Sequence, residues 1–434
     1  MNYIYPKTDE DLKNSRYIDV NKKLGTISEL TDYIFSKLIS NFNYCYKSKI
    51  NNFKKHLNLL LIELYSRYIE DPKGYLSISK NNNDYISINK DVPERYKSMK
   101  LSRTLIEVCN NLIELNLVDY YRGVYYTDLK RLSRIRANSN LIQLFEKFKL
   151  TQINNIKKVK SEVLILKDYK KKLIDYPETK EIVSTRNQII KYNKLLDATN
   201  ITTSVPLLKN FKHNNNVYRI FNNCGNGGGR YYGGWWQQIG SNERKNIILN
   251  GEKTIEIDFK AIHPTLLYLK NNIDITKTGF DPYWSKDPKV RRIFKRLLLC
   301  MLNANSKKKA ISAAIQQVKK TAIENPEKYP EDILKVPKDE YLNLMDKFAN
   351  YNKSIKNYFY SGQGIKLMLE DSYITSLIIE YFTNNNIPIL TIHDSFIINY
   401  KYIDLMILKM KESFNVSLKE FNYSILSIDP IVSY

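Results

Sequence analysis

At 434 residues the chain is long enough for two or three domains with a large core, so it needs neither disulfides nor a structural metal to fold. Its 68 Lys and Arg residues outweigh 45 Asp and Glu residues, and the net charge of +23 predicts a polyanionic partner, nucleic acid above all. A Lys-rich composition that reflects an AT-rich genome is the alternative explanation of this charge.

The cysteines and the apolar runs bear on the compartment. Cys45, Cys109, Cys224 and Cys300 lie far apart with no Cys-x-x-Cys pair. This spacing argues against a zinc site and predicts buried free thiols in a reducing compartment. The chain starts without a signal-peptide pattern, and no apolar run approaches the roughly 20 residues that span a bilayer. We therefore expect an intracellular, cytoplasmic protein without a membrane partner.

The N-terminal third has the outline of a winged helix. Apolar residues recur at helical spacing over residues 28–71, residues 74–78 alternate like a strand, and a second helical run, 101–115, feeds a hairpin-like segment, 117–126. Basic residues around the second helix and the ribbon would form a DNA-facing side: Lys97, Lys100, Arg103, Arg122, Lys130, Arg131, Arg134 and Arg136. An amphipathic helix with ordinary surface charges explains the pattern equally well.

A Lys-rich, mostly helical stretch over residues 151–215 precedes a change of character. Residues 225–238 hold six of the chain's 14 glycines and two of its three tryptophans. Glycines let the backbone approach a ligand closely, and exposed aromatic rings beside Arg stack on bases, so we favour a ligand-binding loop. A packed glycine-rich turn over a tryptophan core is the alternative.

Two aspartates stand at the ends of predicted strands. Asp258 ends the alternating run 254–259, and Asp394 follows His393 at the crest of the apolar run 391–398. Two carboxylates that meet in this way suit a pair of Mg²⁺ ions about 4 Å apart, which stabilise both the attacking and the leaving oxygen of a phosphoryl transfer.

A helix with two cations in register is predicted between these strands. Asp287 and Pro288 form a good cap and first turn, so a helix begins there. Arg291 and Lys295 lie one turn apart on one face, which suits the triphosphate of a nucleotide. Taken alone, an Arg and a Lys one turn apart are usually only part of the solvent-exposed face of a helix.

In order and spacing, the Asp258 strand, the Arg291 and Lys295 helix and the His393-Asp394 hairpin resemble the palm and fingers motifs of the family A polymerase superfamily. This superfamily includes family A DNA polymerases and the single-subunit RNA polymerases of phages and mitochondria. The resemblance covers residues 219 to about 400 and extends to the small, divergent polymerases of viruses and mobile elements. It implies an α+β right-hand polymerase core with palm and fingers over residues 216–434. A largely helical, nucleic-acid-binding region over 1–150 and a connection or thumb-like region over 151–215 would precede it.

The resemblance also implies roles at the reacting groups. Asp258 and Asp394 would bind two Mg²⁺ ions, with the carbonyl of Phe259 as an additional ligand. Lys295 would contact the phosphates and could protonate the leaving pyrophosphate, and Arg291 would neutralise the γ-phosphate.

Further residues would contact the nucleic acid. His393 would touch the primer terminus, and Arg230 with Tyr231 matches a Gly-Arg motif that contacts the hybrid near the site. Glu370 and Asp371 lie in a helix similar, in a loose match, to the one that follows the template. The expected partners are therefore a template with its primer and nucleoside triphosphates.

Three departures from the family pattern bear on the substrate. Asn303 and Ala304 stand where the fingers helix usually has Tyr-Gly, so the usual stacking on the template base is not carried over. His263, five residues past Asp258, is a bulky residue at the nucleotide-binding position that selects the sugar, which favours dNTPs. The His-Asp-Ser order at 393–395 is instead the RNA polymerase form. On balance the sequence leans toward a DNA polymerase.

Other function classes remain open at this stage. A single-subunit RNA polymerase or primase is the runner-up. A non-catalytic winged-helix replication initiator would use only the basic N-terminal half, and a two-metal nuclease would have no need of Arg291 and Lys295. The chain contains no phosphate-binding loop of the Gly-x-x-x-x-Gly-Lys-Ser/Thr type, so no helicase activity is expected.

Overall fold

The computed structural model describes residues 15–18, 22–23, 27–38, 47–87, 92–96, 101–126, 129–150, 157–158, 162–204, 214–324 and 337–434. Contacts divide the chain into two units, Met1–Glu162 and Val163–Tyr434, and each unit has its own large hydrophobic core. Helices combine with largely antiparallel sheets, in keeping with the predicted α+β class. Within the described residues, no helix is both long and apolar enough to cross a membrane.

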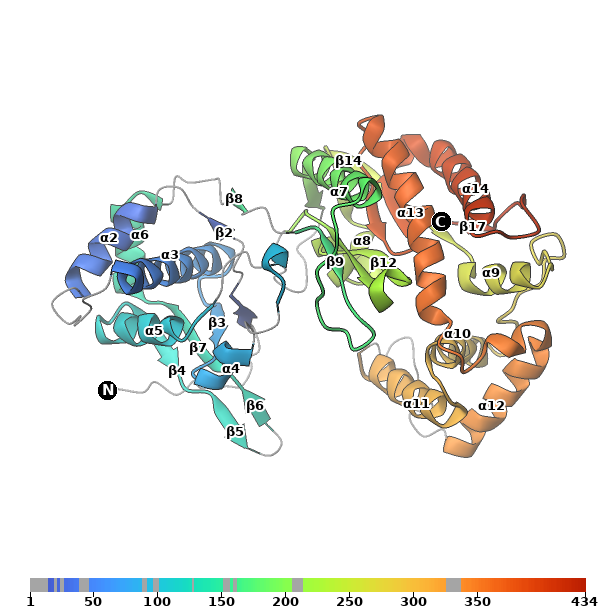
Figure 1. Cartoon of the computed structure of the whole chain (residues 1–434), viewed down its shortest axis with the longest axis horizontal. Coiled ribbons are helices and arrows are strands. Elements are labelled where there is room, and N and C mark those ends of the chain that lie inside the picture. The colour runs from blue at the N-terminus through green and yellow to red at the C-terminus, as the bar shows by residue number, and fades with distance from the viewer. Residues whose placement is uncertain are drawn as a thin grey trace. The chain divides into compact units, whose positions relative to one another are not determined.

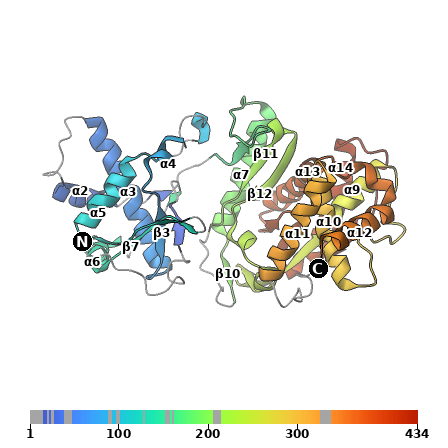
Figure 2. The ribbon, with the colours of Figure 1, turned by 90° about the horizontal axis from the view of Figure 1, so that it is seen from below.

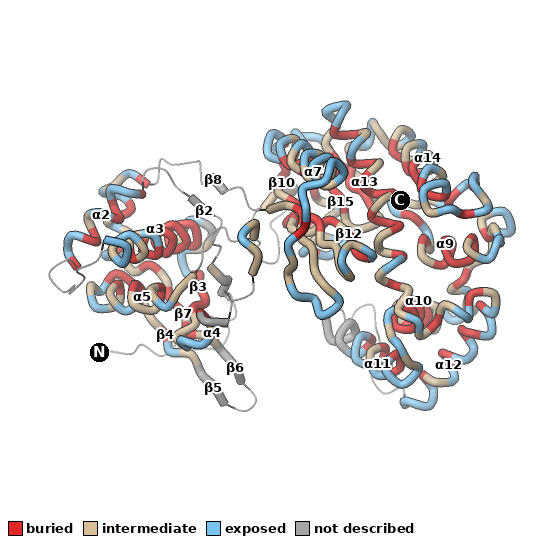
Figure 3. Tube along the Cα trace, in the orientation of Figure 1, coloured by how far each residue is buried: buried red, intermediate tan, exposed pale blue. Residues whose placement is uncertain are grey.

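The first unit packs helices against a small sheet (Figure 1). Its helices are α2 (Ile27–Leu38), α3 (Lys47–Glu70), α4 (Asn82–Ser87), the short 3-10 helix η2 (Glu94–Tyr96), α5 (Thr104–Glu114) and α6 (Ser139–Lys147). The helical spacing over residues 28–71 thus corresponds to two helices, α2 and α3. Buried residues run along α3, as Figure 3 shows, because Leu57, Leu60 and Leu64 recur on one face.

The sheet of the first unit has the strand order β1-β3-β7-β4. The strands of this unit are β1 (Ser15–Tyr17), β2 (Lys22–Lys23), β3 (Tyr75–Ile78), β4 (Val118–Tyr121), β5 (Val124–Tyr126), β6 (Leu129–Arg131), β7 (Ser133–Ala137) and β8 (Lys157–Lys158). The hairpin predicted within residues 117–126 is not formed. β4 pairs with β7 and β5 with β6, because the outgoing strand continues past Gly123 and returns over residues 129–137.

The predicted basic side of this unit is described only in part. Arg103 and Arg122 are exposed, Arg134 donates to the Leu132 carbonyl at 2.9 Å, and Arg136 is held by Asp119 at 2.8 Å. Lys97 and Lys100 lie outside the described residues, and only the backbone is described for Lys130 and Arg131.

The second unit is built on a six-stranded sheet with the order β10-β13-β14-β16-β15 and β17 beside β14. These strands are β10 (Ile201–Thr203), β13 (Ile247–Leu249), β14 (Glu252–Phe259), β15 (Leu390–Ile392), β16 (Ser395–Asn399) and β17 (Val432–Ser433). Alternation along β14 decides which side chains face the core: Ile257 and Phe259 are buried, whereas Asp258 between them is exposed. A smaller sheet joins β12 (Gly227–Tyr232), β11 (Tyr218–Asn222) and β9 (Leu164–Leu166).

Helices surround these sheets. They are α7 (Lys180–Ala198), α8 (Ser241–Arg244), α9 (Ile262–Lys270), α10 (Pro288–Asn303), α11 (Lys307–Glu324), α12 (Lys338–Tyr351), α13 (Gly364–Asn384) and α14 (Ile403–Glu420), with the short helices η4 (Asn223–Gly225), η5 (Trp235–Gln238), η7 (Lys353–Tyr358) and η8 (Tyr400–Tyr402). In both Figure 1 and Figure 2, α10, α11 and α12 lie side by side as one group. α13 is buried along much of its length and packs against β12, α7 and α14. The Tyr192 hydroxyl of α7 donates to the Ile389 carbonyl at 2.7 Å, which ties α7 to the segment leading into β15.

The glycine-rich segment serves close packing. Gly228 and Gly229 of β12 have φ values of +80° and +86°. A Cβ at Gly228 would meet the Ile220 carbonyl at 2.8 Å, and a Cβ at Gly229 would meet the Ser372 hydroxyl of α13 at 2.5 Å. Trp235 and Trp236 are fully buried, so the prediction of exposed aromatic rings is wrong for these two residues. The packed-turn alternative describes this segment.

Three described cysteines are free thiols. Cys109 and Cys300 are buried as expected, but Cys224 is exposed, which corrects the expectation of buried thiols for that residue. Cys45 lies outside the described residues.

Candidate active site

The two aspartates singled out in the sequence lie on neighbouring strands. β14 runs antiparallel to β16, and Asp258 is opposite Ser395 in this pairing. β15 joins β16 through a two-residue turn made of His393 and Asp394, so Asp394 directly precedes the partner of Asp258. His393 adopts a φ of 58°, the left-handed conformation that this tight turn requires.

Each aspartate is in surroundings that disfavour its negative charge. Partial burial and then the charge of Asp394 raise the pKa of Asp258 to about 7, and Glu256 adds to this effect. Burial and then the charge of Asp371 raise the pKa of Asp394, although Arg230 and His263 oppose the shift. A bound cation would relieve the repulsion at both carboxylates.

Glu256 is a third carboxylate near the pair, and we did not predict it. It lies two residues before Asp258 and therefore on the same face of β14. Arg244 holds it through two hydrogen bonds of 2.8 and 2.9 Å, and the Ser395 hydroxyl donates to it at 2.8 Å. The period-two spacing Glu-x-Asp was the sequence signal for this position.

Of the two α10 cations, Lys295 lies near the carboxylates. Burial and then the charge of Arg291 lower the pKa of Lys295, while Asp281 and Asp258 act in the opposite direction. The Nζ of Lys295 lies 5.7 Å from the ring centroid of Tyr283. Arg291 makes an ion pair of 2.9 Å with Asp281. Lys295 is thus close enough to Asp258 to act on its charge, and Arg291 sits one turn away on the same helix.

A buried carboxylate from α13 joins two further predicted residues. Asp371 accepts hydrogen bonds from the Arg230 Nε at 3.0 and 3.1 Å, from the Arg230 Nη2, and from the His263 Nε2 at 2.7 Å. Burial would raise the pKa of Asp371, but the hydrogen bonds from His263 and Arg230 outweigh it and lower the pKa. Asp371 therefore fixes both side chains at the edge of the site. The loose match of residues 370 and 371 to a template helix gave no sign of this arrangement.

The second histidine of the site lies in the turn itself. Burial and then the charge of Arg230 lower the pKa of His393 to about 4, so its ring is neutral at neutral pH. Its ring meets that of Tyr232 edge-on at 5.8 Å, and its buried Nδ1 has no hydrogen-bond partner among the described residues. The Thr375 hydroxyl of α13 donates to its carbonyl at 3.0 Å.

The strand that carries this turn is anchored from the tryptophan segment. The Trp236 Nε1 donates to the Thr391 carbonyl at 3.0 Å, and the Gln237 side-chain amide donates to the same carbonyl at 2.9 Å. The buried tryptophan segment thus positions the hairpin that bears Asp394.

Two predicted nucleic-acid contacts have other surroundings. Tyr231 is 1% exposed, with the guanidinium of Arg219 4.8 Å from its ring, so it is a core residue. Glu370 is buried, with Lys270 at 2.8 Å and the Tyr423 hydroxyl on its carboxylate. Neither side chain is accessible to a nucleic acid, which corrects the expectation for both.

Four predicted positions remain: Phe259, Asn303, Arg103 and Arg134. The ring of Phe259 packs against Phe414 of α14 at 5.8 Å. Asn303 ends α10, is exposed, and fits against Gly364, where a Cβ would come within 2.3 Å of its amide oxygen. Arg103 and Arg134 belong to the first unit.

The donor set has the composition that Mg²⁺ prefers. Mg²⁺ is usually bound through one or two carboxylates together with water and substrate phosphates, rather than by an all-protein cage. The described residues contain no group of three or more His, Cys, Asp or Glu side chains arranged to hold a metal. Asp258 and Asp394, which lie on neighbouring strands and the second of which raises the pKa of the first, fit such a two-carboxylate site.

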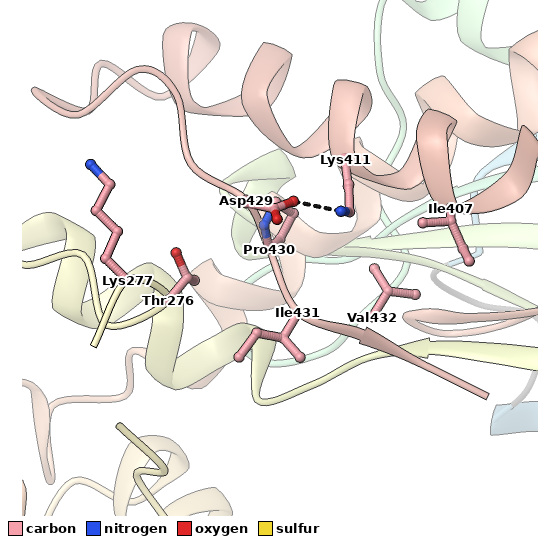
Figure 4. A pocket seen from close by; sticks show the side chains of 8 residues that line it. All are labelled: Thr276, Lys277, Ile407, Lys411, Asp429, Pro430, Ile431 and Val432. Atoms are coloured by element: carbon pink, nitrogen blue, oxygen red, sulfur yellow. Dashed lines mark ion pairs between the residues drawn. The ribbon is translucent and has the colours of Figure 1, made fainter. Parts of the chain in front are cut away.

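A separate hollow lies away from these carboxylates. It has a volume of about 480 Å³ and lies between α14, the segment that leads into β17 and the loop after α9 (Figure 4). Lys411 and Asp429 form an ion pair of 2.6 Å across its wall. The remaining lining residues are Thr276, Lys277, Ile407, Pro430, Ile431 and Val432. Its acidic lining residue, Asp429, is neutralised by Lys411, whereas Asp258 and Asp394 are both held at raised pKa values.

Comparison with known proteins adds no relative: the sequence matches no protein-family model and no curated protein.

Proposed function

We propose that the chain is a template-directed nucleic-acid polymerase, with a DNA polymerase of a virus or mobile element as the leading form. The observation that carries the proposal is the convergence of Asp258, Asp394 and Lys295 from three distant segments. Asp258 lies opposite the residue that follows Asp394, and the charges of Asp394 and Lys295 both act on Asp258. Carboxylates with raised pKa values beside a lysine are characteristic of functional sites, which supports the proposal.

The proposed reaction is an in-line attack of a 3′-hydroxyl on the α-phosphate of a nucleoside triphosphate. Asp258 and Asp394 would hold two Mg²⁺ ions, which would supply neutralisation of the attacking and leaving oxygens. Catalysis by the protein then consists mainly of positioning and charge stabilisation.

The residues of the chain divide this task. Lys295, whose pKa is lowered by burial and Arg291, binds the phosphates and gives a proton to the leaving pyrophosphate more readily than an ordinary lysine. Arg291 neutralises the terminal phosphate by exchanging its contact with Asp281 for one with the nucleotide. His393, neutral and partly buried in the turn, contacts the primer end.

His263 supports the preference for deoxynucleotides. Its ring is held by the buried Asp371 at 2.7 Å and cannot move aside without breaking that hydrogen bond. A fixed, bulky side chain next to the nucleotide site excludes a 2′-hydroxyl by steric contact. A primase or RNA polymerase remains the second candidate, because residues 393–395 have the His-Asp-Ser order.

Extension of a labelled primer on a DNA template with Mg²⁺ tests the proposal, with dNTPs and rNTPs in parallel. We expect extension with dNTPs by the wild type, none by Asp394→Ala, and wild-type extension by Asp404→Ala, an exposed aspartate at the start of α14. Shortening of the primer would indicate a nuclease. Absence of any Mg²⁺-dependent product would favour the non-catalytic replication initiator instead.

A further inference from the structure

The three tryptophans of the chain differ sharply in exposure. Trp235 and Trp236 are fully buried, whereas Trp284, in the segment between α9 and α10, is 51% exposed. Leaving a large indole ring in water costs hydrophobic free energy, and surface tryptophans often mark binding surfaces.

Trp284 is the outer member of a stack of three aromatic rings. Its ring lies 6.2 Å from that of Tyr351 at an interplanar angle of 26°. Tyr351 also stacks with Phe280, with centroids 5.0 Å apart and an angle of 15°. Tyr351 ends α12 and is itself 39% exposed, so the stack opens to solvent at the Trp284 end.

The inner end of the stack is anchored. Phe280 meets the ring of Tyr268 edge-on at 5.5 Å, and the Tyr268 hydroxyl donates to the buried Asn352 at 3.0 Å. The Asn352 amide donates in turn to the Pro282 carbonyl at 3.0 Å. These bonds join the two segments that carry the three stacked rings, so the stack is already formed without a ligand.

The same segment borders the candidate active site. Asp281 binds Arg291, and Tyr283 lies under the ammonium group of Lys295. Trp284 follows directly and lies at the surface. A molecule stacked on Trp284 is therefore a neighbour of the α10 cations.

The charges around the stack favour an anion. Three exposed lysines flank it in the chain, Lys286, Lys347 and Lys353, and Lys347 lies one helical turn before Tyr351. The nearby acidic groups are Asp281, which Arg291 holds, Asp346, which pairs with Lys307 at 2.6 Å, and Asp287 at the start of α10. A flat aromatic surface with solvated lysines is the combination that binds unpaired bases and their phosphates.

We propose that the stack of Phe280, Tyr351 and Trp284 is a docking surface for single-stranded nucleic acid, with an unpaired base stacked on the outer face of Trp284. The choice of strand rests on the proposed function, because a polymerase handles an unpaired template beside its active site. Binding itself requires no catalysis.

Intrinsic fluorescence tests this directly, because Trp284 is the exposed one of the chain's three tryptophans. The full-length protein, in EDTA and without nucleotides, is titrated with an oligo(dT) strand and with a blunt duplex of the same length. Stacking quenches indole emission and shields the ring from acrylamide. We expect a saturable quench and loss of acrylamide access with the single strand, and a weaker effect with the duplex.

Variants separate stacking from general attraction. Trp284→Ala should weaken oligo(dT) binding about 10- to 100-fold in fluorescence anisotropy. Trp284→Phe should abolish the quench while keeping affinity within a few-fold of the wild type. Tyr400→Ala, which removes a 52% exposed ring of the same unit, should leave both signals unchanged.

Two results would overturn the inference. One is saturating oligo(dT) that leaves Trp284 emission and acrylamide access unchanged, or that binds Trp284→Ala as tightly as the wild type. The other is shielding of Trp284 that depends only on protein concentration, seen as a dimer in sedimentation, which would assign the surface to self-association. Quenching without primer extension would refute the proposed polymerase and support the docking surface. Primer extension without quenching would support the polymerase and refute the docking surface.

Discussion

Replacement of Asp258 by Asn should stabilise the metal-free protein while it abolishes activity. Asp258 has a folded-state pKa of about 7 against an ordinary value of 3.8, because burial, Asp394 and Glu256 disfavour its charge. A folded pKa above the unfolded one means that the folded state binds more protons. Its stability therefore falls as the pH rises from about 4 to about 7, and stays low above that range.

The magnitude follows from this shift after a correction for exposure. A shift of this size corresponds to at most ~4 kcal/mol at 1.36 kcal/mol for each pKa unit. Although partly buried, Asp258 keeps much of its surface in contact with solvent, so solvent screening reduces the repulsion, and we expect ~1 kcal/mol. For a unit of more than 200 residues this raises the melting temperature by roughly 2–4 °C.

Thermal unfolding followed by tryptophan emission is the appropriate assay, because Trp235, Trp236 and Trp284 all lie in the second unit. At pH 8 in EDTA, Asp258→Asn should melt above the wild type, and at pH 4 the two should coincide. Added Mg²⁺ should raise the wild-type transition and leave Asp258→Asn unchanged, since ligand binding to the folded state stabilises it. Glu252→Gln, an exposed carboxylate on the same strand, is the matched control.

A lower melting temperature for Asp258→Asn at pH 8 would refute the electrostatic reasoning, because it would show that Asp258 stabilises the fold. An equal Mg²⁺ shift in both proteins would place the metal elsewhere.

Three further outcomes are expected. Asp371→Asn should lower the free energy of unfolding by ~3 kcal/mol in chemical denaturation, because it leaves Arg230 with an uncompensated buried charge. The same variant should discriminate less against rNTPs, and this effect should disappear in a His263→Ala background if Asp371 acts through that ring. Lys295→Ala should lower kcat for incorporation by about 10²–10⁴ in single-turnover kinetics, whereas a rise confined to KM would limit Lys295 to phosphate binding. Gly228→Ala should destabilise the second unit by ~2 kcal/mol or more, because its φ of +80° and the Ile220 carbonyl at 2.8 Å leave no place for a Cβ; an unchanged melting temperature would contradict the close-packing role of the glycines.

The sequence by itself determined the local parts of the site. Alternation along residues 254–259 predicted the strand that carries Asp258, because side chains on a strand point to opposite faces in turn. The apolar run after Pro388 gave the hairpin that presents Asp394, and the 3.6-residue period placed Arg291 and Lys295 on one face of α10. Each of these predictions depends only on residues within a few positions of one another along the chain.

Tertiary structure decided which side chains meet and which are accessible. Asp371 holds Arg230 and His263 across separations of 141 and 108 residues, and no local pattern encodes such a contact. Tyr231 and Trp236 are residue types common in nucleic-acid-binding sites, yet both are buried here: Tyr231 packs against Tyr192 of α7, and Trp236 is hydrogen-bonded to Thr391 of β15. Trp284 has no such cover, since its segment packs through Phe280 and Tyr283 and leaves the indole at the surface. Aromatic residues suit a core and a binding surface equally well, so only the packing of the whole unit separates the two roles.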